Sequence, residues 1–421
     1  MVSLDRLHFL KASTMAGLAP SVAHAGPRVL YPGVYIEELT VPIPTIRPLE
    51  TSETVLVTSI LADPKPVTVS FLSALDDISV RLGGASQLER WVRQFFANGG
   101  KRLTLWPARD GTAAGLIGDR DPALGLKGIE AVGGLFASGW PGANRPLPIG
   151  LILVPEAAAL AYDDVGAAAS VYAAAAETAQ SLSAMAIIDT PAVLGGTRVD
   201  SVDAVLSWRE AIGIETAHAA LYGNFITGGG ADDDAVGPAV AGVIARTDQT
   251  RGVWSAPAGT SAVLRHDVAP NHTTAATEVL NPVGVNTIRT LPGAGTVVWA
   301  ARTLAPEGDE DRFISVRRFR DHIRQTLRFN LQVLALQPNE EATWQAARAS
   351  VEAFLANLLR AGAFAGSTPD EAYFVRCGLG ETMTQVDLDQ GRLIISVGFA
   401  PLRPAEFIVD QVTVEGFATA P

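Results

Sequence analysis

The side chains of a serine hydrolase triad occur in this chain as Asp189, His218 and Ser261, in the order that subtilisins use. In such a site the histidine takes the serine proton, and the aspartate orients the imidazole. The flanking residues do not support this chemistry, because Thr190 and Pro191 follow the aspartate, and the usual Met-Ala-x-Pro is missing after Ser261. We therefore predict that the protein is not an enzyme, with a subtilisin-like serine hydrolase as the alternative.

Sites for a nucleotide, a cofactor or a metal ion leave little trace in the sequence. No GxxxxGK[ST] phosphate loop is present, and the run Gly228–Gly230 is not followed by a lysine. The six histidines are scattered, and Cys377 is the single cysteine, which excludes a cysteine-clustered zinc site. We expect no cofactor and no metal, and we interpret Asp232–Asp234 as a solvated loop tip.

Four arginines recur along a helix that the apolar periodicity predicts over residues 315–334. The simpler interpretation is a solvated face, partly offset by Asp321 and by glutamates of the next helix. The sharper hypothesis is a docking surface for an acidic partner, since a guanidinium engages carboxylates through parallel hydrogen bonds. Spacings of three, four and four residues place the following side chains on one face of the helix: Arg317, Arg320, Arg324 and Arg328.

The composition is typical of a well-buried protein with more than one domain. The chain has 421 residues, of which 48% are hydrophobic, and one core rarely holds so many residues. The net charge of −12 argues against broad contact with nucleic acid or an anionic membrane surface. No apolar run is long enough to insert across a membrane. Arg6, Lys11 and an Ala-His-Ala stretch are weakly similar to an export signal, and we expect a retained extension.

Strand-like segments lie near both ends of the chain. Pro42, Pro44 and Pro48 follow the first of them, fix φ and favour extended conformations in the preceding residues. Such a strand does not easily fold back as a local hairpin, so we expect it to pair with a sheet of a neighbouring subunit. The alternative is an edge strand of its own domain. The expected strand-exchange residues are Val34, Tyr35, Ile36, Glu37 and Glu38 near the start, and Phe407, Ile408 and Val409 near the end.

Strands and helices alternate through the middle of the chain. This alternation predicts an α/β domain whose sheet is covered on both faces. Beyond Pro282 the pattern changes to strands followed by two long helices and two more strands, which predicts an α+β domain. The expected division is an N-terminal extension at 1–27, an extended arm at 28–50, an α/β domain at 51–281, an α+β domain at 282–402 and a C-terminal arm at 403–421.

Many stretches of the chain resemble, in register, the contractile tail sheath proteins of myophages and of related contractile injection systems. Relatives often have Tyr-Pro-Trp where this chain has Gly223-Asn224-Phe225, and the extension at 1–27 has no clear counterpart. The matching stretches are PGVYIEE (32–38), AIIDTP (186–191), AALYGNF (219–225), AGVIARTDQTRGVWSAPAG (241–259), NPVGVNTIRTLPGAGTVVWAARTL (281–304), FISVRR (313–318), QPNEEATW (337–344), STPDEAYFVRC (367–377), MTQVDLDQGRL (383–393) and RPAEFIV (403–409).

The resemblance implies a structural role without a nucleotide or a cofactor. Sheath subunits polymerise around an inner tube, lend terminal strands to a sheet of their neighbours, and contract to drive the tube through a target envelope. The implied partners are further copies of the chain, the inner tube protein, the baseplate, and tail-terminator or cap proteins. The resemblance also implies a subtilisin-like fold for the α/β domain and assembly in the bacterial cytoplasm as part of a phage tail or tail-like particle. The arginine face would then meet an acidic stripe on the tube.

Overall fold

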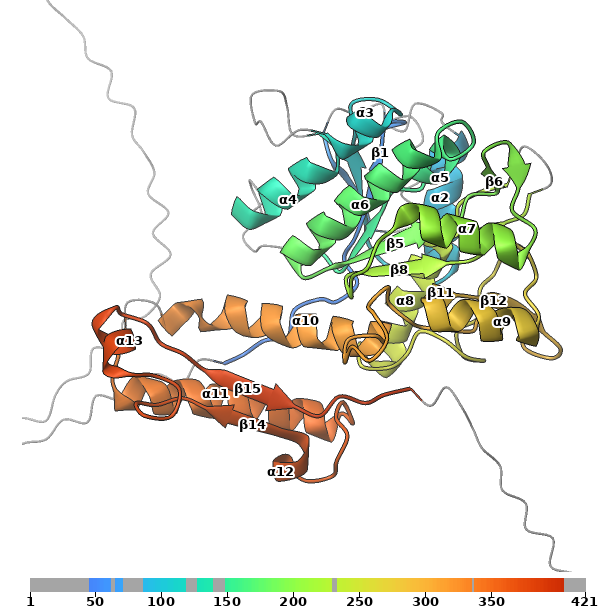
Figure 1. Cartoon of the computed structure of the whole chain (residues 1–421). Helices are drawn as coiled ribbons and strands as arrows, with labels where there is room; N and C mark the ends of the chain where they lie inside the picture. Colours follow the sequence, from blue (N-terminus) through green and yellow to red (C-terminus); the bar gives the residue numbers. More distant parts are fainter. Residues whose placement is uncertain are drawn as a thin grey trace, which may run out of the picture. The chain divides into compact units, whose positions relative to one another are not determined.

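The computed structural model describes residues 45–61, 65–70, 86–118, 127–138, 148–228, 233–334 and 337–404 (Figure 1). The extension at 1–27 and both strand-exchange segments, Val34–Glu38 and Phe407–Val409, lie outside the described residues. Most of the 28–50 arm does as well, and its last six residues are described.

A seven-stranded sheet forms the centre of the described fold. Its order is β11-β8-β5-β4-β1-β3-β2, and all neighbours pair in parallel except β2, which is antiparallel to β3. The strands are β1 (Thr54–Thr58), β2 (Val67–Val69), β3 (Leu103–Pro107), β4 (Leu151–Leu153), β5 (Met185–Asp189), β8 (Ala219–Tyr222) and β11 (Val285–Asn286).

Helices cover both faces of this sheet, because successive apolar side chains of each strand point to opposite sides. Ile187 belongs to one buried core, whereas Ile188 belongs to the other. One core contains α4 (Ile129–Ser138), α6 (Val165–Leu182) and α7 (Val202–Ile212), and the other contains α2 (Ser86–Ala97) and α8 (Gly237–Arg251). The predicted α/β fold is therefore confirmed.

Capping residues fix where the helices α6 and α7 begin and where α7 ends. Asp164 caps α6 by accepting from the amide of Ala167, and Ser201 caps α7 by accepting from the amide of Ala204. Gly213 ends α7 with a φ of 58°, a left-handed conformation that glycine adopts without strain. Shorter elements on the same domain are α3 (Ala113–Ile117), α5 (Glu156–Leu160), α9 (Thr274–Leu280), the hairpin β6 (Val193–Leu194) with β7 (Thr197–Arg198), and the pair β9 (Phe225–Ile226) with β10 (Val268–Ala269).

The sheet extends past the predicted domain boundary at residue 281. Pro282 lies in the short 3₁₀ helix η4 (Asn281–Val283), and Gly284 turns the chain directly into β11. Val285 and Leu304 are fully or almost fully buried in the same core as α6 and α7. The proline therefore marks a turn within the sheet domain, and residues up to about Leu304 belong to that domain.

The remaining described residues build a second structure around two helices. The hairpin of β12 (Ile288–Leu291) and β13 (Gly295–Val298) still belongs to the sheet domain, because Ile288 and Val298 lie in the core with α2 and α8. The two helices are α10 (Ile314–Asn330) and α11 (Glu341–Arg360), with η5 (Leu331–Leu334) between them. Phe319 of α10 packs against Phe364 and Phe399 with ring centroids 5.4 and 5.3 Å apart. The C-terminal elements are α12 (Pro369–Ala372), α13 (Gln385–Asp389) and the antiparallel pair β14 (Tyr373–Arg376) and β15 (Ser396–Phe399).

A carboxyl group is buried at the end of β5. Asp189 has no exposed surface, and its Oδ1 accepts a hydrogen bond from the amide of Gly237 at 2.5 Å. The hydroxyl of Tyr172 donates to Oδ2 at 3.5 Å. Burial, which disfavours the charged form, raises the pKa of Asp189 to about 7.

The stability of the protein should depend on this carboxyl group between about pH 5 and pH 8. The folded-state pKa lies above the ordinary value of 3.8. The contribution of the Asp189 carboxyl group to the unfolding free energy is therefore complete below that ordinary pKa. It decreases as the pH rises and is lost once the pH has passed 7. Relative to Asp189→Asn, the wild type should lose ~2–3 kcal/mol of unfolding free energy across this interval. Chemical denaturation at both pH values measures the difference, and parallel pH profiles would contradict it.

The contact between α2 and α8 should tolerate no side chain at Gly242. A Cβ there would lie 2.3 Å from the carbonyl oxygen of Phe95. We expect Gly242→Ala to lower the unfolding free energy by ~1–3 kcal/mol through overpacking. The matched control is Gly166→Ala in the first turn of α6, where the nearest atom would be 3.4 Å away. That variant should be neutral or slightly more stable, so equal losses in the two variants would contradict the packing argument.

Candidate functional site

The three residues of the predicted triad each have other partners. Nδ1 of His218 lies 2.8 Å from the carbonyl oxygen of Ala184, and Oγ of Ser261 accepts from Arg251 at 2.7 Å. Asp189 is held by Gly237 and Tyr172, as described above. Among the described residues, no hydrogen bond joins any two of Asp189, His218 and Ser261. The structure therefore does not assemble the serine hydrolase alternative, because residue order along the chain does not fix the geometry that a triad requires.

The predicted arginine face is divided by the fold. Arg317 is 8% exposed. It donates to Asp311 at 2.7 Å and forms a paired contact with Asp321 one turn along the helix. Its charge is thus neutralised inside the protein. The structure corrects the expectation that all four guanidinium groups lie on one open face, because the chain before α10 brings Asp311 over the first turn.

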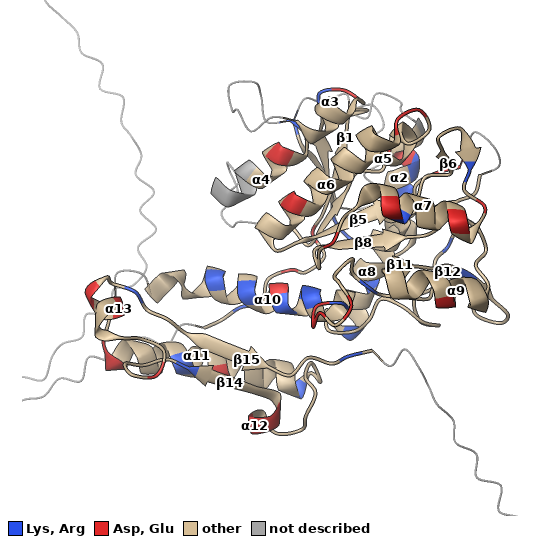
Figure 2. Ribbon diagram, in the orientation of Figure 1, with Lys and Arg blue, Asp and Glu red and all other residues tan. Residues whose placement is uncertain are grey.

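The other three arginines lie progressively further from this network. Arg320 is partly exposed and contacts Asp311 at 3.0 Å and Glu310 at 3.3 Å. Arg324 and Arg328 are exposed, and within the described part of the chain neither has a carboxylate partner. Figure 2 shows the basic residues distributed along α10. The exposed part of the predicted face therefore consists of Arg324 and Arg328, with Arg320 at its margin.

A buried ion pair that the sequence did not reveal lies on another side of α10. Both terminal nitrogens of Arg318 donate to the two carboxylate oxygens of Asp248, each at 2.7 Å. The side chains are only 5% and 3% exposed. Nη2 of Arg318 also donates to the carbonyl of Thr51 at 2.8 Å, and the Thr51 hydroxyl donates to Asp248 at 2.6 Å. No local sequence pattern signals this pair, because Arg318 lies on the side of α10 away from Phe319 and Ile323 and its partner belongs to α8.

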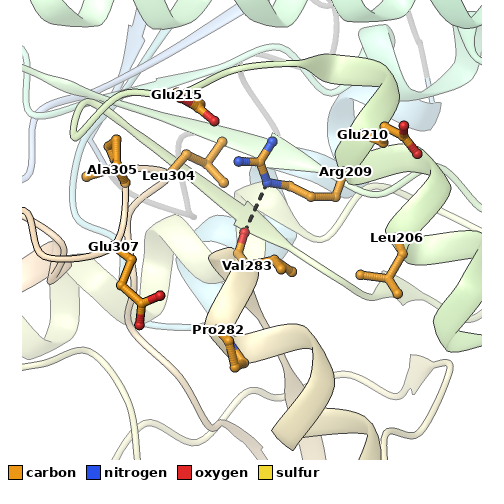
Figure 3. Close-up of a pocket in the computed structure, with 10 residues that line it drawn as sticks. Leu206, Arg209, Glu210, Glu215, Pro282, Val283, Leu304, Ala305 and Glu307 are labelled. Carbon is orange, nitrogen blue, oxygen red and sulfur yellow. Dashed lines mark hydrogen bonds between the residues drawn. The ribbon is translucent and has the colours of Figure 1, made fainter.

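An acid-rimmed groove of about 420 Å³ lies between α7, η4 and the segment after β13 (Figure 3). Arg209 extends across it and donates from Nε to the carbonyl of Val283 at 3.0 Å. The groove combines apolar side chains with carboxylates from separate segments, which no local sequence pattern predicts. Its lining residues include the apolar Leu206, Pro282, Leu304 and Ala305 and the acidic Glu210, Glu215 and Glu307.

The described residues contain no cluster of three or more histidine, cysteine or acidic side chains that could hold a metal ion. Cys377 is fully buried, and burial raises the pKa of its thiol to about 11. This places the cysteine in the interior and disfavours the reactive thiolate at neutral pH. None of the helices in the described ranges is long and apolar enough to cross a membrane.

Comparisons with known proteins agree with the resemblance in the sequence. Residues 156–304 match the family model of the phage tail sheath protein central domain. A search of curated proteins gave no match. The matched range begins at α5 and ends where the sheet domain ends, so it contains three of the seven strands of the sheet, β5, β8 and β11.

Solved structures extend the similarity to almost the whole chain. The sheath of the PVC extracellular contractile injection system in its contracted state is 26% identical with a TM-score of 0.69, covering 91% of this chain and 97% of that one. The contracted helical sheath of the anti-feeding prophage is 29% identical with a TM-score of 0.69, covering 91% and 98%. A chain of the anti-feeding prophage baseplate is 28% identical with a TM-score of 0.68, covering 91% and 99%. The chain is therefore similar over 91% of its length to sheath subunits of contractile injection systems, and its residues 156–304 match the central domain of phage tail sheath proteins.

Proposed function

We propose that the protein is the structural subunit of a contractile sheath that polymerises around an inner tube and contracts to drive the tube through a target envelope. The observation that carries this function is the similarity, over nine tenths of the chain, to sheath subunits solved in contracted assemblies. The α/β sheet domain, a fold we take to be subtilisin-like, then forms the body of the subunit. The parts outside 51–402 serve as an extension at 1–27 and as two connecting arms.

Exchange of terminal strands would hold neighbouring subunits together. Within the described residues, β14 and β15 form a sheet of only two strands, and Phe374 of β14 is 48% exposed. Such an isolated pair is marginally stable in water, and added strands supply both backbone hydrogen bonds and apolar cover. We infer that Val34–Glu38 of one neighbour and Phe407–Val409 of another complete this sheet. The described chain reaches Pro404, a few residues after the end of β15 and shortly before Phe407–Val409.

Contact with the inner tube is the role that we assign to the exposed arginines. Arg324 and Arg328, with Arg320 beside them, would meet acidic side chains of the tube, whereas Arg317 serves inside the subunit. Exposed ion pairs contribute only ~0.2–1 kcal/mol each. Many subunits would together hold the tube, yet each contact would release when the sheath contracts.

Further partners follow from the same role. Because a baseplate chain is among the similar structures, we propose that the sheath begins on a baseplate and ends at a tail-terminator or cap protein. Assembly would occur in the bacterial cytoplasm, within a phage tail or a tail-like particle. The hydrolase alternative has no support in the geometry, and labelling of Ser261 by a fluorophosphonate probe would revive it.

Deletion of residues 1–40 should abolish polymerisation without unfolding the subunit. The truncation removes Val34–Glu38 and with it several interstrand hydrogen bonds, worth ~1 kcal/mol each, at every contact. The matched control is deletion of residues 1–27, which keeps the strand and should still give tubes. Negative-stain microscopy distinguishes tubes from monomers, and normal tubes from the longer truncation would refute strand exchange.

The double variant Arg324→Glu, Arg328→Glu should separate sheath from tube. Repulsion from an acidic tube should give empty or already contracted sheaths when sheath and tube are produced together. Arg360→Glu serves as the control, because Arg360 is an exposed arginine at the end of a different helix, α11. Extended sheath on its tube in the double variant, counted by electron microscopy, would show that this face does not dock the tube.

A further inference from the structure

The segment that leads into β1 runs antiparallel along α10 and is held by side chains of that helix. The amide of Arg47 donates to Oδ1 of Asn330 at 3.0 Å, and Nδ2 of Asn330 donates back to the carbonyl of Arg47 at 2.9 Å. The amide of Leu49 donates to the hydroxyl of Thr326 at 3.3 Å. Arg318 then reaches the carbonyl of Thr51 at 2.8 Å.

The rise of the extended arm matches the rise of the helix α10. An extended chain advances ~6.6 Å in two residues, and a helix advances ~6 Å in four. Arg47 and Leu49 therefore meet positions one helical turn apart, Asn330 and Thr326. The residue between them is Pro48, which has no backbone N–H, so that position leaves no donor without an acceptor. The proline that favoured an extended arm in the sequence also suits the chain to this helix face.

The attachment is firm at one end and weak at the other. Thr51 is bonded to Arg318 and to Asp248, whose side chains are 5% and 3% exposed. The reciprocal bonds between Arg47 and Asn330 are exposed to solvent. Exposed backbone hydrogen bonds open more readily than buried ones. Release should therefore begin at the Ile46–Arg47 end, where Ile46 is only partly buried, and proceed towards Thr51.

We propose that Thr326 and Asn330 form an arm track, a binding site on α10 that sets the point at which the N-terminal arm leaves the subunit. When the track is occupied, the chain is held from Ile46 onward, because the Ile46 side chain packs against the core that contains Phe319 and Ile323. When it is released, the arm departs at Thr51 and gains five free residues, about 16 Å of chain. This inference rests on the proposed exchange of the N-terminal strand. The track would hold the arm in one direction in the extended sheath and free it as neighbouring subunits move in contraction.

Hydrogen exchange on the full chain as dilute, unassembled subunits tests the track itself. In the double variant Thr326→Val, Asn330→Ala, exchange of the peptide covering Arg47 and Leu49 should rise at least about fivefold, as expected for the loss of one net hydrogen bond. Protection of β1 should not change. Gln332→Ala is the control, because Gln332 is exposed in η5 and should leave the arm protected. Equal exchange in the wild type and the double variant would overturn the proposal.

A second measurement keeps the test decisive if that variant is disturbed elsewhere. Cysteines introduced by Arg47→Cys and Asn330→Cys can be joined by a short cleavable thiol crosslinker, since the single native cysteine is buried. Crosslinked subunits should polymerise but fail to contract fully, and cleavage of the crosslinker should restore contraction. Full contraction while crosslinked would overturn the release step. If the wild type forms no sheath at all, the proposed function fails, whereas the exchange result on unassembled subunits still decides the track.

Discussion

The buried ion pair between Arg318 and Asp248 fixes how α10 lies against the sheet domain. It connects three segments that are distant in the sequence, namely the entry to β1, the helix α8 and α10 itself. A buried pair of this kind adds little net stability, but removal of one partner leaves an uncompensated charge in the interior, at a cost of ~3–5 kcal/mol. The rotation of α10 about its own axis is thereby set. Asn330 and Thr326 then meet the incoming chain, and Arg324 and Arg328 face solvent.

Each side of α10 has a separate task because of that fixed rotation. Phe319 and Ile323 pack into the core shared with α11, and Arg317 is neutralised by Asp311 and Asp321. A single helix of seventeen residues thus links the sheet domain, the C-terminal elements and the N-terminal arm. A displacement of one of these parts is therefore transmitted to the others through α10.

The sequence predicted the sheet domain well, because its buried strands are nearly continuous apolar runs that alternate with helices. The boundary at 281 could not be predicted in the same way. A proline followed by a glycine looks the same whether it begins a linker or, as at Pro282 and Gly284, makes a turn before an edge strand of two residues. Helical spacing likewise grouped Arg317 with Arg324, but periodicity does not reveal that an acidic loop covers the first turn. The function was predicted from the many stretches that resemble the family. The order of Asp189, His218 and Ser261 along the chain carried no information about their geometry.

The alanine-rich helix α6 has a mechanical consequence. Its buried face consists largely of small side chains, including Ala168, Ala175, Ala176 and Ala179, which let the helix lie close to the sheet. Close-packed protein interiors have low compressibility, so the body of the subunit behaves as a rigid block. A filament made of rigid blocks stores its elastic energy at the joints between them. Such joints act as springs in series, so that a longer filament releases more work and travels further, while the force it exerts is set by a single layer.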